Sequence, residues 1–101
     1  MTNSTEISPA ELLAALERAL GAGSVTLEAL VLDARGEWDR AHQRVAAVED
    51  RDAYWVHAYL HRKEGDLSNA AYWYRRAGRE PATASLEEEW REIAAALLAG
   101  R

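Results

Sequence analysis

Two histidines and a glutamate stand at a spacing that could hold a metal ion. His57, His61 and Glu64 are four and three residues apart, so on an α-helix they share one face. Two histidines one helical turn apart are a common way to bind a zinc-like ion, and the Glu64 carboxylate could be a third ligand. His42, beside Trp38 on the apolar face of the preceding predicted helix, could join them.

The same residues have a purely structural interpretation, which we favour. Partly buried histidines are commonly hydrogen-bonded to each other or to nearby carboxylates, here Glu64 or Asp66. The chain has no cysteine to complete a typical structural zinc site. We therefore expect His57 and His61 to be hydrogen-bonded within the helix packing, with no metal and no other cofactor. The alternative that stays open is a small metal- or ligand-binding enzyme that uses His42, His57 and His61.

A second group of residues combines aromatic and basic side chains, which together suit an anionic partner. Aromatic rings beside arginine can stack, and the guanidinium group binds carboxylate or phosphate through two hydrogen bonds. The group covers one face of the predicted fourth helix and the outer face of the predicted fifth: Trp55, Tyr59 and Arg62, then Asn69, Tyr72, Arg75 and Arg76. In the alternative interpretation, the aromatic rings pack against the first and last helices while the arginines pair with acidic residues elsewhere.

The charges are distributed unevenly along the chain, and this distribution indicates which class of partner the protein can bind. The 101 residues carry 12 Lys and Arg against 17 Asp and Glu, a net charge of −5. Residues 51–79 hold six basic and three acidic side chains, so this segment is +3 and the remainder is −8. Because the phosphate backbone repels an acidic protein, general nucleic-acid binding is disfavoured. We expect the partner to be a protein or an acidic peptide.

Several functional classes are disfavoured by features that the sequence lacks. Without cysteine there is no disulfide framework and no thiol chemistry. The sequence holds no nucleophile elbow, phosphate-binding loop, dinucleotide fingerprint or zinc-protease motif. No apolar run approaches the length of a membrane span, about 18–20 residues, and Met1–Ser8 lacks the pattern of a secretory signal. We expect a cytoplasmic protein with no membrane partner.

The pattern of capping residues, glycines and prolines predicts six α-helices and no β-strand. Two capping boxes satisfy free backbone groups at helix starts: Ser8 with Glu11, and Ser85 with Glu88. Glycines at 21, 36, 65 and 100 mark helix ends. The helices are predicted over about 9–20, 25–35, 37–49, 53–64 (capped by Asp52), 67–77 and 86–99. The chain is thus one all-α domain, residues 9–101, after a polar N-terminal tail, residues 1–8.

The apolar patterns differ from helix to helix. The predicted fourth helix is apolar nearly all round, and the second carries apolar residues on two opposite sides. Helices of this kind are buried between others. The first and last helices each have a single apolar stripe, so we expect them to cap a buried middle. The run Glu87–Glu89 is interpreted as a solvated start of the last helix, where acidic groups favour the helix dipole.

A short repeat links residues 25–49 to residues 53–78. Gly36 and Gly65, 29 residues apart, are each followed by a large apolar residue and then by alanine: Trp38 and Ala41, Leu67 and Ala70. With further matches at Tyr54, Ala58, Tyr74 and Ala77, residues 54–81 resemble a tetratricopeptide repeat, and residues 25–48 resemble a degenerate one. Trp38 and Tyr74 are predicted core residues of these two hairpins.

This resemblance implies a fold and a function. The fold is a right-handed array of three antiparallel helical hairpins with capping first and last helices. The face that carries Trp55, Tyr59 and Arg62 corresponds to an inner groove that binds the ligand. The function is that of a small non-enzymatic module for binding a protein or peptide. Residues 57–78 are also similar to a group of short microbial proteins, a likeness that adds no function.

Overall fold

The computed structural model describes residues 8–20 and 24–100. Over these residues it consists of six α-helices and contains no β-strand, as the sequence predicts. The helices are α1 (Pro9–Ala19), α2 (Val25–Ala34), α3 (Trp38–Ala46), α4 (Arg51–Glu64), α5 (Leu67–Ala77) and α6 (Leu86–Ala99). None of them is long and apolar enough to cross a membrane. The predicted N-terminal tail, apart from Ser8, and the predicted helix end at Gly21 lie outside the described residues.

Five of the six described helices start at a side-chain cap, α3 being the exception, and one of these caps differs from the prediction. Both predicted capping boxes are present, at the starts of α1 and α6. At α4, however, the cap is Asp50 and not Asp52, because the Asp50 carboxylate accepts a hydrogen bond from the Ala53 backbone N–H at 2.8 Å. Asp50 is extended (φ −149°, ψ 166°), so α3 has to end before it. The helix ends at Ala46 rather than near Glu49.

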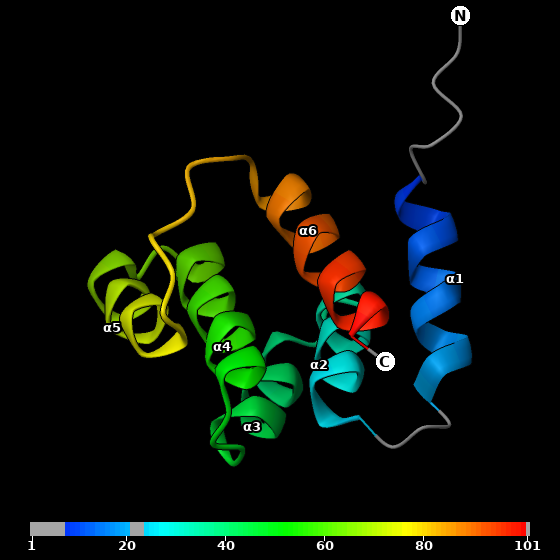
Figure 1. Ribbon diagram of the computed structural model, residues 1–101, viewed down its shortest axis with the longest axis horizontal. Coiled ribbons are helices and arrows are strands. Elements are labelled where there is room, and N and C mark those ends of the chain that lie inside the picture. Colours follow the sequence, from blue (N-terminus) through cyan, green and yellow to red (C-terminus); the bar gives the residue numbers. More distant parts are fainter. Residues whose placement is uncertain (1–7, 21–23, 101) are drawn as a thin grey trace, which may run out of the picture.

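Helix packing places α4 in the middle of the molecule (Figure 1). It packs on α2, α3, α5 and α6, whereas α2 packs on α1, α3, α4 and α6. Eight residues of α4 and six of α2 are buried, as expected of the two helices with apolar residues on more than one side. The first and last helices, α1 and α6, pack on each other and on α2. They cover the central helices from one side.

Small residues and one left-handed turn let α5 lie close to α4. Ala58 of α4 and Ala70 of α5 are buried, with 0% and 2% of their surface exposed. Gly65 ends α4 with φ +91°, a backbone conformation that side chains other than glycine rarely adopt. Tyr74, predicted as a core residue, is 2% exposed. Trp38 is only partly buried: its ring packs against the core, and its indole N–H donates to the Leu60 carbonyl at 2.8 Å.

Candidate functional site

Trp55 and Tyr59, which the repeat resemblance places in an open groove, lie inside the protein. Each is 3% exposed. The Trp55 indole N–H donates to the Glu89 carboxylate of α6 at 3.3 Å, and the Tyr59 hydroxyl donates to the Asp33 carboxylate of α2 at 3.1 Å. Neighbouring helices therefore cover this face, and the two rings do not line an open groove. The packing alternative holds in part: Trp55 contacts the last helix, as that alternative expects, whereas Tyr59 bonds to α2.

Arg62 also points inward, onto the buried carboxylate of Glu89. Glu89 is 1% exposed, and it accepts hydrogen bonds from Arg62 Nη1 at 2.8 Å and from the Tyr74 hydroxyl at 2.5 Å, besides that from Trp55. Arg62 donates in addition to the Ala84 carbonyl. Hydrogen bonds between charged groups are the strong ones, so Glu89 ties α4, α5 and α6 together.

Sequence reasoning missed Glu89, since it grouped this residue with its two solvated neighbours. Glu87 and Glu88 are exposed as expected. The sequence feature that indicates a buried Glu89 is its position on the helix relative to the apolar residues. It lies three residues after Leu86 and four before Ile93, both on the apolar stripe of α6, so its side chain points toward the core.

Asp33 is a second buried carboxylate, 3% exposed, at the end of α2. It accepts hydrogen bonds from Tyr59 at 3.1 Å and from Lys63 Nζ at 2.9 Å. Burial raises the pKa of Tyr59 and of Tyr74 well above the ordinary value of a tyrosine. The neighbouring carboxylate, Asp33 for Tyr59 and Glu89 for Tyr74, raises the pKa further. Both tyrosines are therefore protonated donors. Every fully buried polar side-chain atom of the described residues has a hydrogen-bond partner, which marks these networks as structural.

A hollow of about 420 Å³ lies beside the Asp33 network, between α1, α2, α4 and α6. Its apolar wall is formed by Pro9, Ala10, Leu13, Ala34, Leu86 and Trp90. The charged groups at its edge include Asp33 and Lys63, which already form an ion pair. The hollow is therefore mainly an apolar recess.

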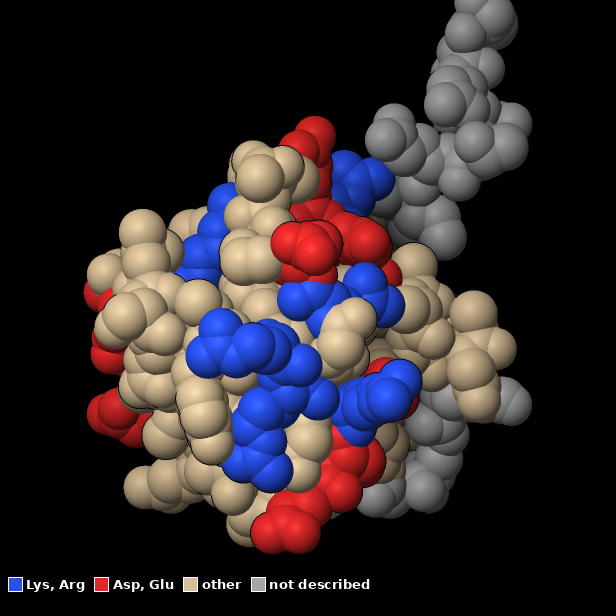
Figure 2. All heavy atoms as spheres, turned by 60° about the vertical axis from the view of Figure 1, so that its left-hand side comes forward, with Lys and Arg blue, Asp and Glu red and all other residues tan. Residues whose placement is uncertain are grey.

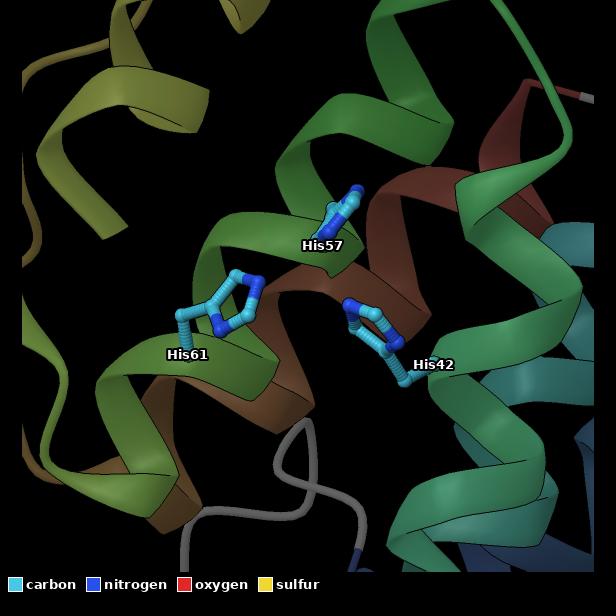
Figure 3. Close-up of side chains that lie close together, drawn as sticks. All are labelled: His42, His57 and His61. Carbon is cyan, nitrogen blue, oxygen red and sulfur yellow. The ribbon is translucent and has the colours of Figure 1, made fainter. Parts of the chain in front are cut away.

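The three histidines converge between α3 and α4, as Figure 3 shows. The ring centroids are 4.6 Å apart for His42 and His57, 4.9 Å for His57 and His61, and 5.0 Å for His42 and His61. His57 and His61 are 5% and 6% exposed, and His42 is half-buried. One ring nitrogen from each histidine lies within 4.8 Å of the other two. The structure thus adds His42 to the pair that the helical spacing places together.

Aromatic rings and one carboxylate surround this histidine cluster. Trp38 stacks on His42 with an interplanar angle of 7°, and Trp73 stacks on His57 at 15°. Glu64 Oε2 lies 2.8 Å from His61 Nδ1, so the predicted hydrogen bond of His61 is confirmed. Asp66, the other predicted partner, caps α5 instead. His57, expected to be hydrogen-bonded, is held by ring stacking, and within residues 8–20 and 24–100 its imidazole has no hydrogen-bond partner.

Burial keeps the imidazoles of His42 and His57 neutral at pH 7. Burial, followed by the positive charges that His42 and His61 could carry, lowers the pKa of His57 to about 4. Burial also lowers the pKa of His42, with a further contribution from His61, whereas Glu64 and Asp39 act in the opposite direction. Neutral imidazoles present a free lone pair, the form that binds metal ions.

We expect acid to destabilise the protein through His57. In the unfolded chain the pKa of His57 is 6.5, so between pH 6.5 and about 4 the unfolded state takes up a proton that the folded state excludes. The stability that depends on neutral His57 is complete above pH 6.5 and falls by about 3 kcal/mol as the pH drops to about 4.

Urea unfolding at pH 7.5 and at pH 4.5, with a chelator in both buffers, measures this effect. His57→Gln cannot titrate and is the control, because every other acid-sensitive group is retained. The variant should lose less stability than the wild type between the two pH values. Equal losses would show that His57 is protonated as readily in the folded protein as in the unfolded chain.

The outer face of α5 is exposed as predicted, and arginines gather at its end. Tyr72 is 44% exposed, and Arg75 and Arg76 are exposed as well. The Arg76 guanidinium lies 4.6 Å from the ring centroid of Tyr54 and donates to the hydroxyls of Tyr54 at 3.2 Å and Tyr72 at 3.3 Å. The Arg79 guanidinium lies 3.3 Å from the ring centroid of Trp55.

Arg51, at the start of α4, lies beside Gly78 at the end of α5. Its Nη1 atom would be 3.8 Å from a Cβ atom built on Gly78, so Arg51 belongs to the same group of arginines. We call Arg51, Arg75, Arg76 and Arg79 the arginine face. Figure 2 shows Lys and Arg side chains gathered across the middle of the side on which α5 lies. None of the four forms an ion pair with a carboxylate of the described residues.

No family model, curated protein or solved structure matches the chain. The resemblance to tetratricopeptide repeats therefore stays a prediction. Function has to be argued from the sites themselves, because a fold alone does not imply an activity.

Proposed function

We propose that the protein is a small non-enzymatic interaction module whose arginine face binds an acidic segment of another protein. The observation that supports this proposal is the concentration, on one face of a chain with a net charge of −5, of four arginines that form no ion pair with another described residue. Elsewhere in the same protein Arg35, Arg40, Arg44 and Arg62 each pair with a carboxylate. The arginine face is therefore a local concentration of positive charge, on which the Glu49 carboxylate acts through Arg76 without forming an ion pair.

The aromatic contacts of this face prepare it for a carboxylate ligand. Arg76 is held over the rings of Tyr54, Tyr72 and Trp73, and Arg79 is held over Trp55. A guanidinium group stacked on a ring can still donate from its edge to a carboxylate, and Arg76, which gives one N–H of Nη1 to Tyr72 and one of Nη2 to Tyr54, has further N–H groups for this purpose. Because stacking already restricts these side chains, less conformational entropy is lost when a ligand binds.

A protein segment fits this charge distribution better than a nucleic acid does. The segment 51–79 is +3, but the remaining residues sum to −8. A short acidic peptide can contact the arginine face alone, whereas a long phosphate backbone would also run past acidic surface. We therefore name an acidic protein segment as the partner.

We also propose the finer architecture that the resemblance implies, a right-handed array of three antiparallel hairpins of the tetratricopeptide kind. Support comes from the packing of α2 on α3 and of α4 on α5, each pair joined by a short turn with a left-handed glycine, Gly36 or Gly65. In this proposal the binding face is the outer one, because α6 and α2 cover the inner face. A cytoplasmic location stays a prediction of the sequence.

The test uses a fluorescent oligoglutamate peptide and fluorescence anisotropy. We expect wild-type protein to bind the peptide with an affinity that falls as salt rises, since exposed charges are screened. Arg75→Ala with Arg76→Ala should weaken binding by about tenfold and lessen its salt dependence. Arg62 is unsuitable for this test, because its guanidinium group already pairs with the buried carboxylate of Glu89.

The matched control is Arg40→Ala with Arg44→Ala, which removes two exposed arginines of α3 that already pair with carboxylates. This control should bind the peptide as the wild type does. Equal weakening in the two double variants would mean that net charge alone attracts the peptide. Tighter binding of a single-stranded oligonucleotide than of the peptide would assign the face to nucleic acid instead.

A further inference from the structure

The histidine cluster, His42, His57 and His61, is not used by the proposed interaction, and its geometry suits a different ligand. One nitrogen from each ring lies within 4.8 Å of the other two, so a point between them is at most about 2.8 Å from each nitrogen. Zinc–imidazole bonds are about 2.0–2.1 Å long, so each nitrogen has to move inward by roughly 0.7 Å. Small side-chain rotations supply a movement of this size.

We propose that His42, His57 and His61 together bind one late first-row divalent cation, such as Zn²⁺, through three imidazole nitrogens. This differs from the metal-free, hydrogen-bonded cluster that the sequence favours. The observation behind the difference is the position of His42, which reaches from α3 to the pair on α4 (Figure 3). Three nitrogen ligands leave the fourth tetrahedral position to water, whereas Mg²⁺ and Ca²⁺ require oxygen ligands.

Each ligand is oriented by a neighbour. Glu64 Oε2, 2.8 Å from His61 Nδ1, fixes the proton on that nitrogen and leaves the lone pair of Nε2 for the ion. His42 stacks on Trp38, whose indole N–H is itself bonded to the Leu60 carbonyl. His57 stacks on Trp73 at a centroid distance of 3.9 Å. A hydrogen bond like that of His61 is typical of metal-binding histidines because it sets the tautomer, whereas the stacking contacts of His42 and His57 hold only the direction of their rings.

The lone pairs of the other two histidines are uncommitted. Neither the His42 ring nor the His57 ring forms a hydrogen bond with another residue in the part of the chain that the structure describes. No fully buried polar side-chain atom of that part lacks a partner, so the ring nitrogens of these two histidines retain contact with solvent. His42, which is half-buried, is the member of the cluster most open to solvent.

Titration of chelator-treated protein with Co²⁺ alone and with Zn²⁺ alone tests the site. Co²⁺ should bind one ion per chain and give the intense visible bands of a tetrahedral site, and Zn²⁺ should displace it. His42→Gln should weaken Zn²⁺ binding by about 100-fold or more, and Glu64→Gln by about 10–100-fold. Zn²⁺ should also raise the melting temperature of the wild type but not of His42→Gln, because a ligand that binds the folded state stabilises it.

The control variant is Asp66→Ser, which retains a capping side chain for α5 and tests the more exposed group of His61, Glu64 and Asp66. It should bind Zn²⁺ as the wild type does. The proposal is overturned if the wild type binds no stoichiometric ion. It is also overturned if His42→Gln keeps wild-type affinity while Asp66→Ser loses it, since the ion then sits at the exposed group. The melting curves show whether each variant is folded, and peptide binding to the arginine face is independent of either result.

Discussion

Glu89→Ala is expected to lower the free energy of unfolding by about 3–5 kcal/mol, the usual cost of removing one partner of a buried ion pair. The Arg62 side chain, 18% exposed, would lose its only carboxylate partner in the structure described. The Tyr74 hydroxyl and the Trp55 indole N–H would lose their acceptor at the same time. Each buried donor left without an acceptor adds a desolvation cost.

Urea unfolding at pH 7 measures this effect, with Glu87→Ala as the matched control on the same helix. Glu87 is exposed in the first turn of α6, so its loss should cost less than about 1 kcal/mol through the helix dipole alone. Glu89→Gln retains the shape of the side chain but removes its charge, and it should lie between the two. If Glu89→Ala is no less stable than Glu87→Ala, the network contributes nothing to the fold.

Tyr74→Ala is expected to destabilise the protein by about 3–5 kcal/mol, because it removes a large buried aromatic side chain. Tyr74 is 2% exposed and packs between α5 and its neighbours, with its hydroxyl on Glu89. Tyr72, two residues earlier on the same helix, is 44% exposed, so Tyr72→Ala should cost about 0.5 kcal/mol or less. Two tyrosines of one helix thus report separately on the buried and the exposed face.

Tyr74→Phe separates the ring from the hydroxyl. It should cost about 1.5–3 kcal/mol, the value of a hydrogen bond to a charged acceptor. Combined with Glu89→Ala it should cost less than the sum of the two single changes, since both remove the same hydrogen bond. Thermal and urea unfolding of the wild type, the two single variants and the double variant give the four free energies that this double-mutant comparison needs. Strict additivity would contradict a direct bond between the two side chains in solution.

The sequence by itself determined the helices. Capping boxes at Ser8 and Ser85, the left-handed glycine at 65 and the apolar period all act within a few residues along the chain. The one wrong cap, at the start of α4, is a case that the local sequence does not decide. Asp50 and Asp52 are both good N-cap residues, and the choice between them depends on where α3 ends and how α4 packs.

Only the tertiary structure decided which faces are buried. Trp55, Tyr59 and Arg62 share a helix face that a sequence pattern assigns equally well to a groove or to a core. The outcome depends on α2 and α6, which supply Asp33 and Glu89 as partners from 26 and 34 residues away. A carboxylate is buried only where donors from other helices compensate its loss of water, and such donors are not visible in the local sequence.

For the histidine cluster too, the sequence determines one part and the tertiary structure another. The spacing of His57 and His61 determines that they share a face of α4, because helical geometry fixes positions one turn apart. Whether His42 meets them depends on the angle and register at which α3 packs on α4. That register places the His42 ring 4.6 Å from His57 and 5.0 Å from His61. Three nitrogens can share one ion only when two helices bring them together. The candidate site therefore depends on how α3 packs on α4, and the spacing of His57 and His61 alone does not create it.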